Sequence, residues 1–254
     1  MFIDSHAHLE LEDYDRDRDE VVQRARDAGV ELIVTIGIDL ADSRKAVALT
    51  KRYNEVYASI GVHPHDVKSV DDETYNALKE LAKHNKVVAY GEIGLDFYRN
   101  LSPRQTQIRR FSEQLDLAMD LDLPVIIHSR NAHTETYDIL KQWQGKHRGV
   151  IHCFSGNADQ AEQFLDLGFY ISIPGPVTYK KAPKIQNVVR QVPLDSLMIE
   201  TDAPFLTPEP YRGKRNEPAF VVYTAKKVAE LKGVSIDEAG RITSDNTKRL
   251  FGID

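Results

Sequence analysis

Six side chains that can bind metal ions follow short apolar segments of this 254-residue chain. Two of them, His6 and His8, are two residues apart, and residues i and i+2 of an extended strand point to the same side. The other four stand at the ends of later apolar segments: Glu92, His128, His152 and Asp202. A buried imidazole or carboxylate is costly unless it is paired or coordinated. The set therefore predicts a metal centre.

The number of ligands indicates two ions. Six donors exceed the four that a tetrahedral ion needs, and they suit two divalent ions about 3.5–4 Å apart that share a carboxylate. We expect Glu92 to be that bridge. One ion would be held with His6, His8 and Asp202, and the other with His128 and His152. Imidazole ligands favour Zn, Mn, Fe, Co or Ni, and the carboxylates also suit Mg.

Such a centre predicts hydrolysis without a protein nucleophile. Paired divalent ions lower the pKa of bound water toward neutrality. Asp202 is the candidate general base for that water, and Glu92 is catalytic as the bridge. Cys153 directly follows a predicted ligand. Strand alternation is expected to point Cys153 away from the ligands, as a small buried core residue.

Eight short apolar runs are the elements that position these residues. Each has strand length and little sign of a solvated face, as in a parallel sheet that is covered on both faces. They span residues 2–5, 32–36, 56–61, 87–91, 124–128, 149–153, 169–173 and 197–201. Helical patterns alternate with them at residues 16–28, 42–52, 73–84, 104–121, 134–142, 158–167, 182–191 and 218–232, and a further helix is expected at residues 235–251.

The alternation predicts an α/β fold, a single-domain (β/α)8 TIM barrel over residues 1–254 with an extra C-terminal helix. An open doubly wound sheet fits the same alternation. The polar side chains favour the barrel. In a closed barrel the C-terminal ends of the strands converge, whereas in an open sheet of this size they would spread along an edge of about 35 Å.

Composition restricts the class of protein further. With 41% hydrophobic and 28% charged residues, the chain is typical of globular proteins. It shows no signal peptide and no apolar run near the ~20 residues of a spanning helix, so no membrane association is expected. Cys153 is the only cysteine, which excludes an internal disulfide, and we expect a cytoplasmic monomer. The net charge of −6 argues against a passive DNA-binding module but not against an enzyme with a positive cleft.

Further polar residues are expected around the metals. His63 follows the third apolar run and Arg130 follows a predicted ligand by two residues, and both are candidates for binding a phosphate. Asp4 and Glu200 each precede a predicted ligand by two residues, so they are expected beneath the metals, where they would accept the free N–H of a histidine.

A basic loop offers further phosphate contacts: Arg212, Lys214 and Arg215. Aromatic candidates for base stacking are Phe97, Tyr98 and Phe154.

Several of these segments resemble the motifs of the TatD-type deoxyribonucleases, which belong to the amidohydrolase-like metal barrels. The segments are residues 2–9 (FIDSHAHL), 61–65 (GVHPH), 91–98 (GEIGLDFY), 124–130 (PVIIHSR), 152–156 (HCFSG) and 199–206 (IETDAPFL). The resemblance covers nearly the whole chain. It implies a nuclease that depends on divalent metals and degrades DNA, often from the 3′ end, with the six residues above as metal ligands. The family also has members proposed to act on other esters, including aminoacyl-tRNA.

Two other functions use the same residues differently. A small-molecule amidohydrolase or phosphotriesterase-like enzyme would use the same metals on another electrophile. A carbamylated lysine that bridges the ions at the end of the fourth strand would favour this function. This chain has Glu92 at that position instead. A binding protein with a purely structural metal would need a closed site, whereas these ligands are expected at an open barrel mouth. The expected partner is therefore DNA with single-stranded or frayed ends.

Overall fold

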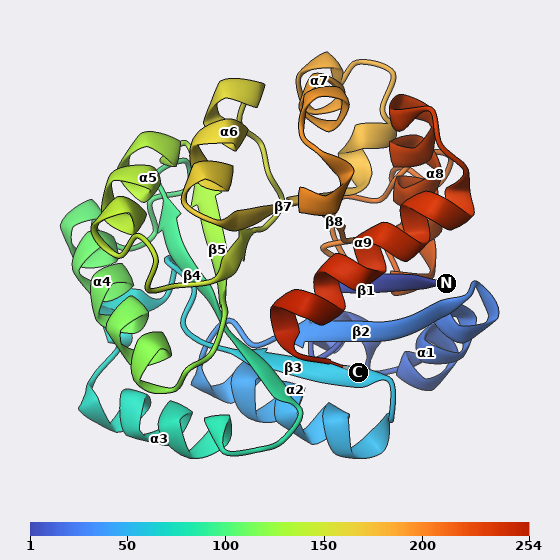
Figure 1. The fold of residues 1–254 in the computed structure, drawn as a ribbon. Coiled ribbons are helices and arrows are strands. Elements are labelled where there is room, and N and C mark those ends of the chain that lie inside the picture. Colours follow the sequence, from blue (N-terminus) through green and yellow to red (C-terminus); the bar gives the residue numbers. More distant parts are fainter. Residues whose placement is uncertain (254) are drawn as a thin grey trace.

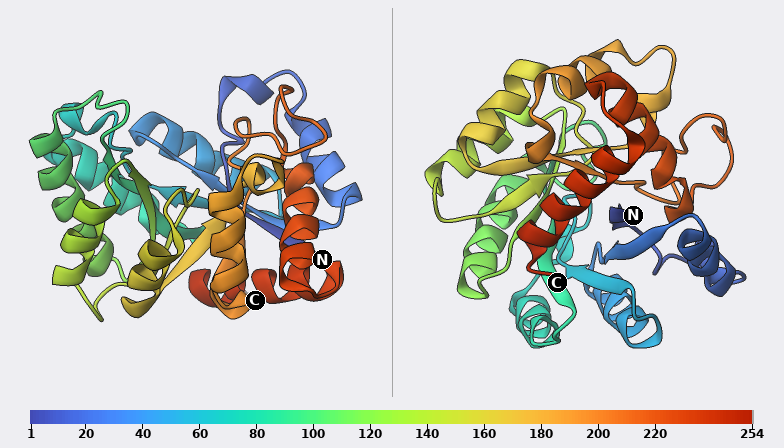
Figure 2. Two further views of the ribbon diagram at one scale, coloured as in Figure 1. Left: turned by 90° about the horizontal axis from the view of Figure 1, so that it is seen from above. Right: turned by 45° about the vertical axis from the view of Figure 1, so that its right-hand side comes forward.

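A computed structural model describes residues 1–253 of the chain (Figures 1 and 2). Within these residues, eight parallel strands form one sheet in sequence order, and consecutive strands are hydrogen-bonded neighbours. The strands are β1 (Phe2–Ala7), β2 (Val30–Ile36), β3 (Val56–Ile60), β4 (Val87–Asp96), β5 (Val125–Arg130), β6 (Gly149–Ile151), β7 (Phe169–Ile173) and β8 (Leu197–Ile199). The predicted barrel is confirmed.

The sheet closes between its first strand and the segment that follows its last one. Ala7 and Ala203 form a parallel bridge. The amide of His8 donates to the carbonyl of Ala203 at 2.8 Å, and the amide of Asp202 donates to the carbonyl of His6 at 2.9 Å. An open doubly wound sheet has no such contact between its two edges, so that alternative is wrong.

Helices follow the strands along the chain and cover the outside of the barrel (Figure 1). They are α1 (Arg18–Asp27), α2 (Leu40–Arg52), α3 (Asp72–Ala82), α4 (Arg104–Asp120), α5 (His133–Gln142), α6 (Ala158–Asp166), α7 (Pro183–Gln191), α8 (Val221–Lys232) and α9 (Ile236–Phe251). Local signals set their ends: Asp71 caps α3 through the amide of Thr74, and Gly233 ends α8 with a φ of 69°. Within residues 1–253, no helix combines the length and the apolar character needed to cross a membrane.

Some boundaries differ from the prediction. Residues 218–220, predicted to begin a helix, form a 3-10 turn before α8. Strand β4 is longer than predicted, so Glu92 lies inside it, whereas β6 and β8 are shorter and His152 and Asp202 lie just beyond them. The backbone leaves the extended conformation there, with a φ of 45° at Cys153 and 54° at Asp202. The alternation that was expected to direct Cys153 away from the ligands therefore does not apply, because this residue is not in a strand.

The C-terminal helix closes the end of the barrel opposite the strand C-termini. Leu250 and Phe251, from the last turn of α9, and Ile253 pack in one cluster with Ile126 and Met198 from the strands. Partly buried residues near the starts of three strands surround this cluster: Leu32, Tyr57 and Tyr170. The helix crosses the barrel beside β1 and β8 (Figure 1). Its apolar end therefore keeps water out of the base of the barrel and leaves the other end open.

This arrangement predicts that the end of α9 stabilises the whole barrel. Phe251 is 5% exposed, and Phe251→Ala would leave a cavity at the base. We expect the free energy of unfolding to fall by about 3–5 kcal/mol, measured by urea denaturation. The control Asp245→Ala, at an exposed position of the same helix, should cost less than ~1 kcal/mol. Equal losses in the two variants would show that Phe251 is not part of the stabilising core.

Candidate metal centre

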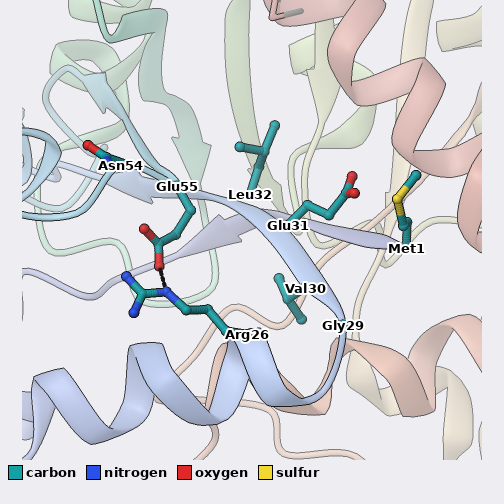
Figure 3. Close-up of a pocket in the computed structure, with 8 residues that line it drawn as sticks. All are labelled: Met1, Arg26, Gly29, Val30, Glu31, Leu32, Asn54 and Glu55. Carbon is teal, nitrogen blue, oxygen red and sulfur yellow. Dashed lines mark hydrogen bonds and ion pairs between the residues drawn. The ribbon is translucent and has the colours of Figure 1, made fainter.

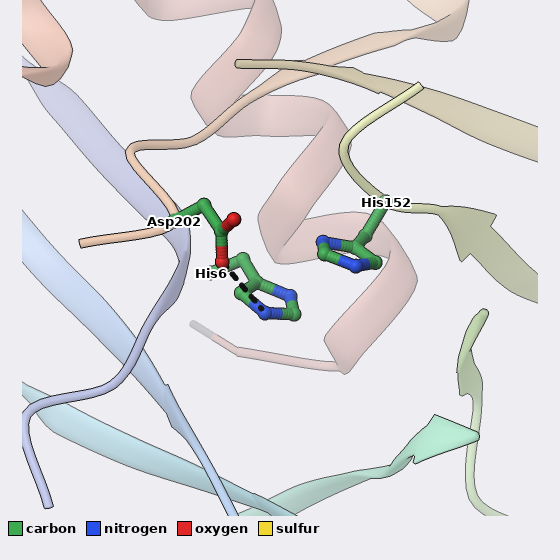
Figure 4. Close-up of side chains that lie close together, drawn as sticks. All are labelled: His6, His152 and Asp202. Carbon is green, nitrogen blue, oxygen red and sulfur yellow. Dashed lines mark ion pairs between the residues drawn. The ribbon is translucent and has the colours of Figure 1, made fainter. Parts of the chain in front are cut away.

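The predicted metal ligands lie together at the C-terminal mouth of the barrel. The rings of His6 and His152 stack with their centroids 3.9 Å apart. Oδ1 of Asp202 lies 3.7 Å from Nε2 of His6, and one ligand atom from each of the three residues lies within 4.8 Å of the others (Figure 4). The fold thus brings side chains from the beginning, middle and end of the chain to one point.

Glu92 lies between two sets of histidines. Its Oε2 faces the first strand, at 3.4 Å from Nε2 of His6 and 4.0 Å from Nε2 of His8. Its Oε1 faces the later strands, at 2.8 Å from Nε2 of His152 and 2.5 Å from Nδ1 of His128. The carboxylate is 3% exposed. Its two oxygens are therefore directed at different groups of histidines.

The orientation of His8 shows that a cation fits this site. Nδ1 of His8 lies 3.1 Å from both Oε1 of Glu10 and the carbonyl oxygen of Ile36, so it is the nitrogen that carries a proton in the neutral ring. The lone pair of Nε2 then faces Oδ1 of Asp202 at 3.4 Å and Oε2 of Glu92 at 4.0 Å. Three acceptors directed toward one region are unfavourable unless a proton or a metal ion lies between them.

Charges in the cluster shift the pKa values of its members in opposite directions. Burial lowers the pKa of His8, but hydrogen bonds to Asp202 and Glu10 outweigh it and hold the pKa well above its ordinary value. Burial raises the pKa of Glu92, but the surrounding imidazoles, His152 first among them, hold it well below its ordinary value. Glu92 is therefore ionised. A metal ion that binds here displaces protons from histidines.

Glu10 supports the site and was missed by the sequence analysis. Its Oε1 contacts Nδ1 of His8, while its Oε2 accepts the hydroxyl of Thr35 at 2.6 Å. This carboxylate fixes the ring so that Nε2 of His8 points into the cluster. The signal was present in the sequence, because Glu10 follows His8 by the same two-residue step that separates His8 from His6.

Asp96 is a second carboxylate that the sequence analysis did not place. Its Oδ2 lies 3.3 Å from Nε2 of His128 and 3.0 Å from Nε2 of His65, and its Oδ1 accepts the amides of Tyr98 and Arg99. Burial raises the pKa of Asp96, but hydrogen bonds from the two histidines lower it far below its ordinary range. Asp96 was missed because the predicted strand ended five residues earlier, at residue 91 rather than 96.

Asp4 and Glu200 lie beneath the ligands, and both are fully buried. Oε1 of Glu200 lies 3.5 Å from Nδ1 of His152 and accepts the amide of Cys153 at 2.7 Å. Asp4 was expected to accept an imidazole N–H; instead it accepts the amide of Thr201 at 2.9 Å and its hydroxyl at 2.5 Å. Burial raises the pKa of Asp4 to about 8. Asp4 thus ties the segment after β8 to β1.

His63 presents a proton to the centre. Its Nδ1 accepts the amide of His65 at 3.1 Å, so the proton of the neutral ring is on Nε2, which lies 3.4 Å from Oε1 of Glu92. Burial lowers the pKa of His63 to about 4, and the ring is neutral at neutral pH. One ring nitrogen of His63 lies within 4.8 Å of ligand atoms of Glu92 and His128, so the three residues could also hold an ion. The proton on Nε2 nevertheless makes His63 better suited to donate a hydrogen bond than to bind a metal ion.

Two arginines at the rim lie over tyrosine rings. The guanidinium of Arg130 is 4.0 Å from the ring centroid of Tyr98, and that of Arg212 is 4.4 Å from Tyr179. Both arginines are exposed, as is Lys214. In the part of the chain that the structure describes, residues 1–253, none of these three cations pairs with a carboxylate. Their charges are available to an anionic ligand.

Arg215 differs from its neighbours in the same loop. Its guanidinium lies 2.6 Å from Oδ2 of Asp17 and 3.6 Å from Oε1 of Glu217, over the ring of Tyr14. The charge that was predicted to contact phosphate is thus balanced within the protein. Binding a phosphate would require breaking this pair, so Arg215 is less available to a substrate than Arg212 and Lys214.

The aromatic residues that were predicted to stack on bases differ in how far they are exposed to solvent. Phe97 and Phe154 are 8% and 2% exposed, so they belong to the core and the expectation that they stack on bases is wrong. Tyr98 is 59% exposed. Phe205, which the sequence analysis did not single out, is 53% exposed and follows Asp202 by three residues. Only burial distinguishes these aromatic side chains, and local sequence does not encode it.

A surface hollow at the base of the barrel is separate from this centre (Figure 3). Its lining includes Met1, Glu31 and the ion pair between Arg26 and Glu55. The paired groups neutralise each other, and none of the predicted site residues lines the hollow. The polar cluster at the mouth, rather than this hollow, is therefore the candidate active site.

Comparison with known proteins agrees with this geometry. The sequence model of the family described as TatD related DNase matches residues 3–252. The chain belongs to this family. A relative in Bacillus subtilis (strain 168), the uncharacterized metal-dependent hydrolase YabD, is 46% identical over 255 residues, which span all of both chains.

Two further relatives widen the comparison. The 3'-5' ssDNA/RNA exonuclease TatD of Klebsiella pneumoniae (strain 342) is 38% identical, over 98% of this chain and 97% of that protein. The crystal structure of YJJV, a TatD homolog from Escherichia coli K12, superposes with a TM-score of 0.94 at 34% identity, over 100% of this chain and 98% of the other. The protein is thus a metal-dependent hydrolase of the TatD family.

Glu10→Gln should weaken metal binding in this TatD-family protein. The variant loses the negative charge that holds the Nδ1 proton of His8, and removing such a supporting carboxylate typically costs 10–100-fold in metal affinity. Titration of purified protein against a competing chelator measures the loss. Glu12→Gln, which changes an exposed carboxylate nearby in the chain, is the matched control. Unchanged affinity in Glu10→Gln would mean that Glu10 does not position the ligand.

Proposed function

We propose that this hydrolase cleaves phosphodiester bonds of DNA and acts as a 3′–5′ exonuclease on single-stranded ends. The observation that carries the proposal is the position of Glu92, whose two oxygens face separate sets of ligands. This arrangement suits the two-metal hydrolysis of phosphate esters. The name of the Klebsiella relative, an ssDNA/RNA exonuclease at 38% identity, supports the same class of substrate.

The proposal includes two divalent ions that share Glu92. One would be held with His6, His8 and Asp202, and the other with His128 and His152. The mixed imidazole and carboxylate donors suit Zn, Mn, Co, Fe or Ni, and Mg less well. When bound, such ions polarise a phosphoryl oxygen and lower the pKa of water.

Asp202 is the proposed general base. Burial raises its pKa, but the hydrogen bond with His8 and the charge of His6 bring the pKa below its ordinary value. The carboxylate is therefore ionised at neutral pH. Its side chain is 14% exposed, at the open side of the cluster. From there it can accept the proton of the water that attacks phosphorus.

The remaining residues would hold the substrate. Nε2–H of His63 points toward the centre and can donate to an oxygen of the scissile phosphate. The exposed Arg130, Arg212 and Lys214 can contact phosphates on either side of it. These local charges are needed because the chain as a whole carries a net charge of −6. The centre thus separates chemistry, carried out by buried groups, from binding, carried out at the rim.

Asp202→Asn should keep the fold and lower the turnover of labelled single-stranded DNA by about 100-fold or more, the scale of a general acid–base contribution. Assays with Mg, Mn, Co or Zn supplied measure this, and Asp195→Asn at an exposed position is the control. Near-normal turnover of metal-loaded Asp202→Asn would exclude the role as base. If the wild-type enzyme cut no DNA with any of these metals, the nuclease proposal would be wrong.

Replacing Arg212 and Lys214 together by Ala should raise the apparent KM for DNA and flatten its salt dependence. On single strands, the log–log slope should fall by about 0.7 for each phosphate that the protein no longer neutralises. Hydrolysis of a small phosphodiester should respond far less, because such a substrate does not reach the rim. The control is Arg241→Ala with Lys248→Ala on α9, which removes the same charge elsewhere. An equal loss of both activities would show that the loop shapes the metal centre rather than the path of DNA.

A further inference from the structure

Phe205 is an apolar ring held in solvent beside a highly polar site. It is 53% exposed, and its ring centroid lies 6.2 Å from that of His8. Its neighbour Leu206 is also exposed, at 37%. A phenylalanine in this position forgoes the stabilisation that burial of its ring would give. Packing within the protein therefore does not explain why a phenylalanine stands at this position.

The backbone that presents Phe205 is held in one conformation. Asp202 and Leu206 have φ values of 54° and 55°, which are unfavourable for residues other than glycine and tend to occur where function requires them. The amide of Phe205 donates to the carbonyl of Asp202 at 2.9 Å. The side chain of Asn216 donates to the carbonyls of Thr201 and Phe205, at 2.9 and 2.5 Å. The backbone that carries the ring is thus preorganised, which lowers the entropic cost of binding against it.

The other exposed aromatic residue at the rim is already covered. Tyr98 carries the guanidinium of Arg130 on its ring at 4.0 Å. Within residues 1–253, no cationic side chain lies over the ring of Phe205 in this way. The exposed half of Phe205 is therefore not occupied by a cation, and its closeness to His8 would place a group that stacks there next to the metal centre.

We propose that Phe205 is the platform on which a nucleobase adjacent to the scissile phosphate stacks. A base is planar and apolar on its faces, and stacking on an aromatic side chain is tolerant of sequence. In a duplex the bases are paired and stacked on one another, so only an unpaired base reaches this ring. The inference rests on the proposed nuclease function. It adds that Phe205 selects single-stranded nucleic acid by its bases, while the cations recognise only phosphate.

Binding of a fluorescent base tests this contact directly. The probe is an oligonucleotide with 2-aminopurine at its 3′ end, whose fluorescence is quenched on stacking. It is mixed with Asp202→Asn protein and Mn, because this variant should cut about 100-fold more slowly and so leave time to measure binding. Phe205→Ala in that protein should abolish the quenching and raise Kd about 10-fold. Phe205→Tyr should preserve both signals. Ile236→Ala, which shortens an exposed apolar side chain at the start of α9, is the control.

Cleavage by protein with Asp202 intact distinguishes this inference from the nuclease proposal. If single-stranded DNA is cut and Phe205→Ala raises KM about 10-fold, both are supported. If DNA is cut but Phe205→Ala changes neither KM nor the quenching, the stacking inference is wrong and the nuclease proposal stands. Binding with quenching that depends on Phe205, without cleavage, would support stacking and overturn the nuclease. Neither binding nor cleavage would overturn both.

Discussion

The carboxylate of Glu92 needs positive charge on both of its oxygens, and the rest of the centre is arranged around that need. It is 3% exposed, and an unbalanced charge at that depth would be strongly unfavourable. Imidazoles meet it from both sides, His6 at Oε2 and His128 and His152 at Oε1. Without metal, protons on the histidines supply the balance, and divalent ions can replace them. Without protons or metal ions, the lone pairs of these carboxylate oxygens and ring nitrogens would repel one another. The cluster is therefore well suited to bind cations.

Histidines serve in such a cluster only when their rings are oriented, and a second layer of acceptors does this. Glu10 holds Nδ1 of His8, and Asp96 lies beside Nε2 of His128. Each pairing leaves the opposite nitrogen of the ring directed toward the centre. A ring free to flip would present a proton as often as a lone pair. The supporting carboxylates thus decide which atoms are available to a metal.

The barrel separates stability from chemistry along its axis. At one end, the apolar end of α9 fills the base with Phe251 and its neighbours. At the other, β1 meets the segment after β8 through the amides of His8 and Asp202. Because closure and the placement of His8 and Asp202 use the same short segments, these predicted ligands cannot be positioned unless the barrel is closed. The rim beyond them carries exposed arginines on tyrosine rings, which give local positive charge in a chain of net charge −6.

The sequence by itself determined the alternation of strands and helices, the barrel that follows from it, and the candidate ligands at the strand ends. These depend on periodicity and on spacing such as that of His6 and His8, which are properties of short segments. Tertiary structure alone decided that Arg215 is bound to Asp17, 198 residues away, and that Phe154 is buried whereas Phe205 is exposed. It also decided where β4, β6 and β8 end. Charge pairing, burial and strand ends depend on contacts between segments far apart in the chain, and a local pattern carries no information about which distant side chain or solvent a residue will meet.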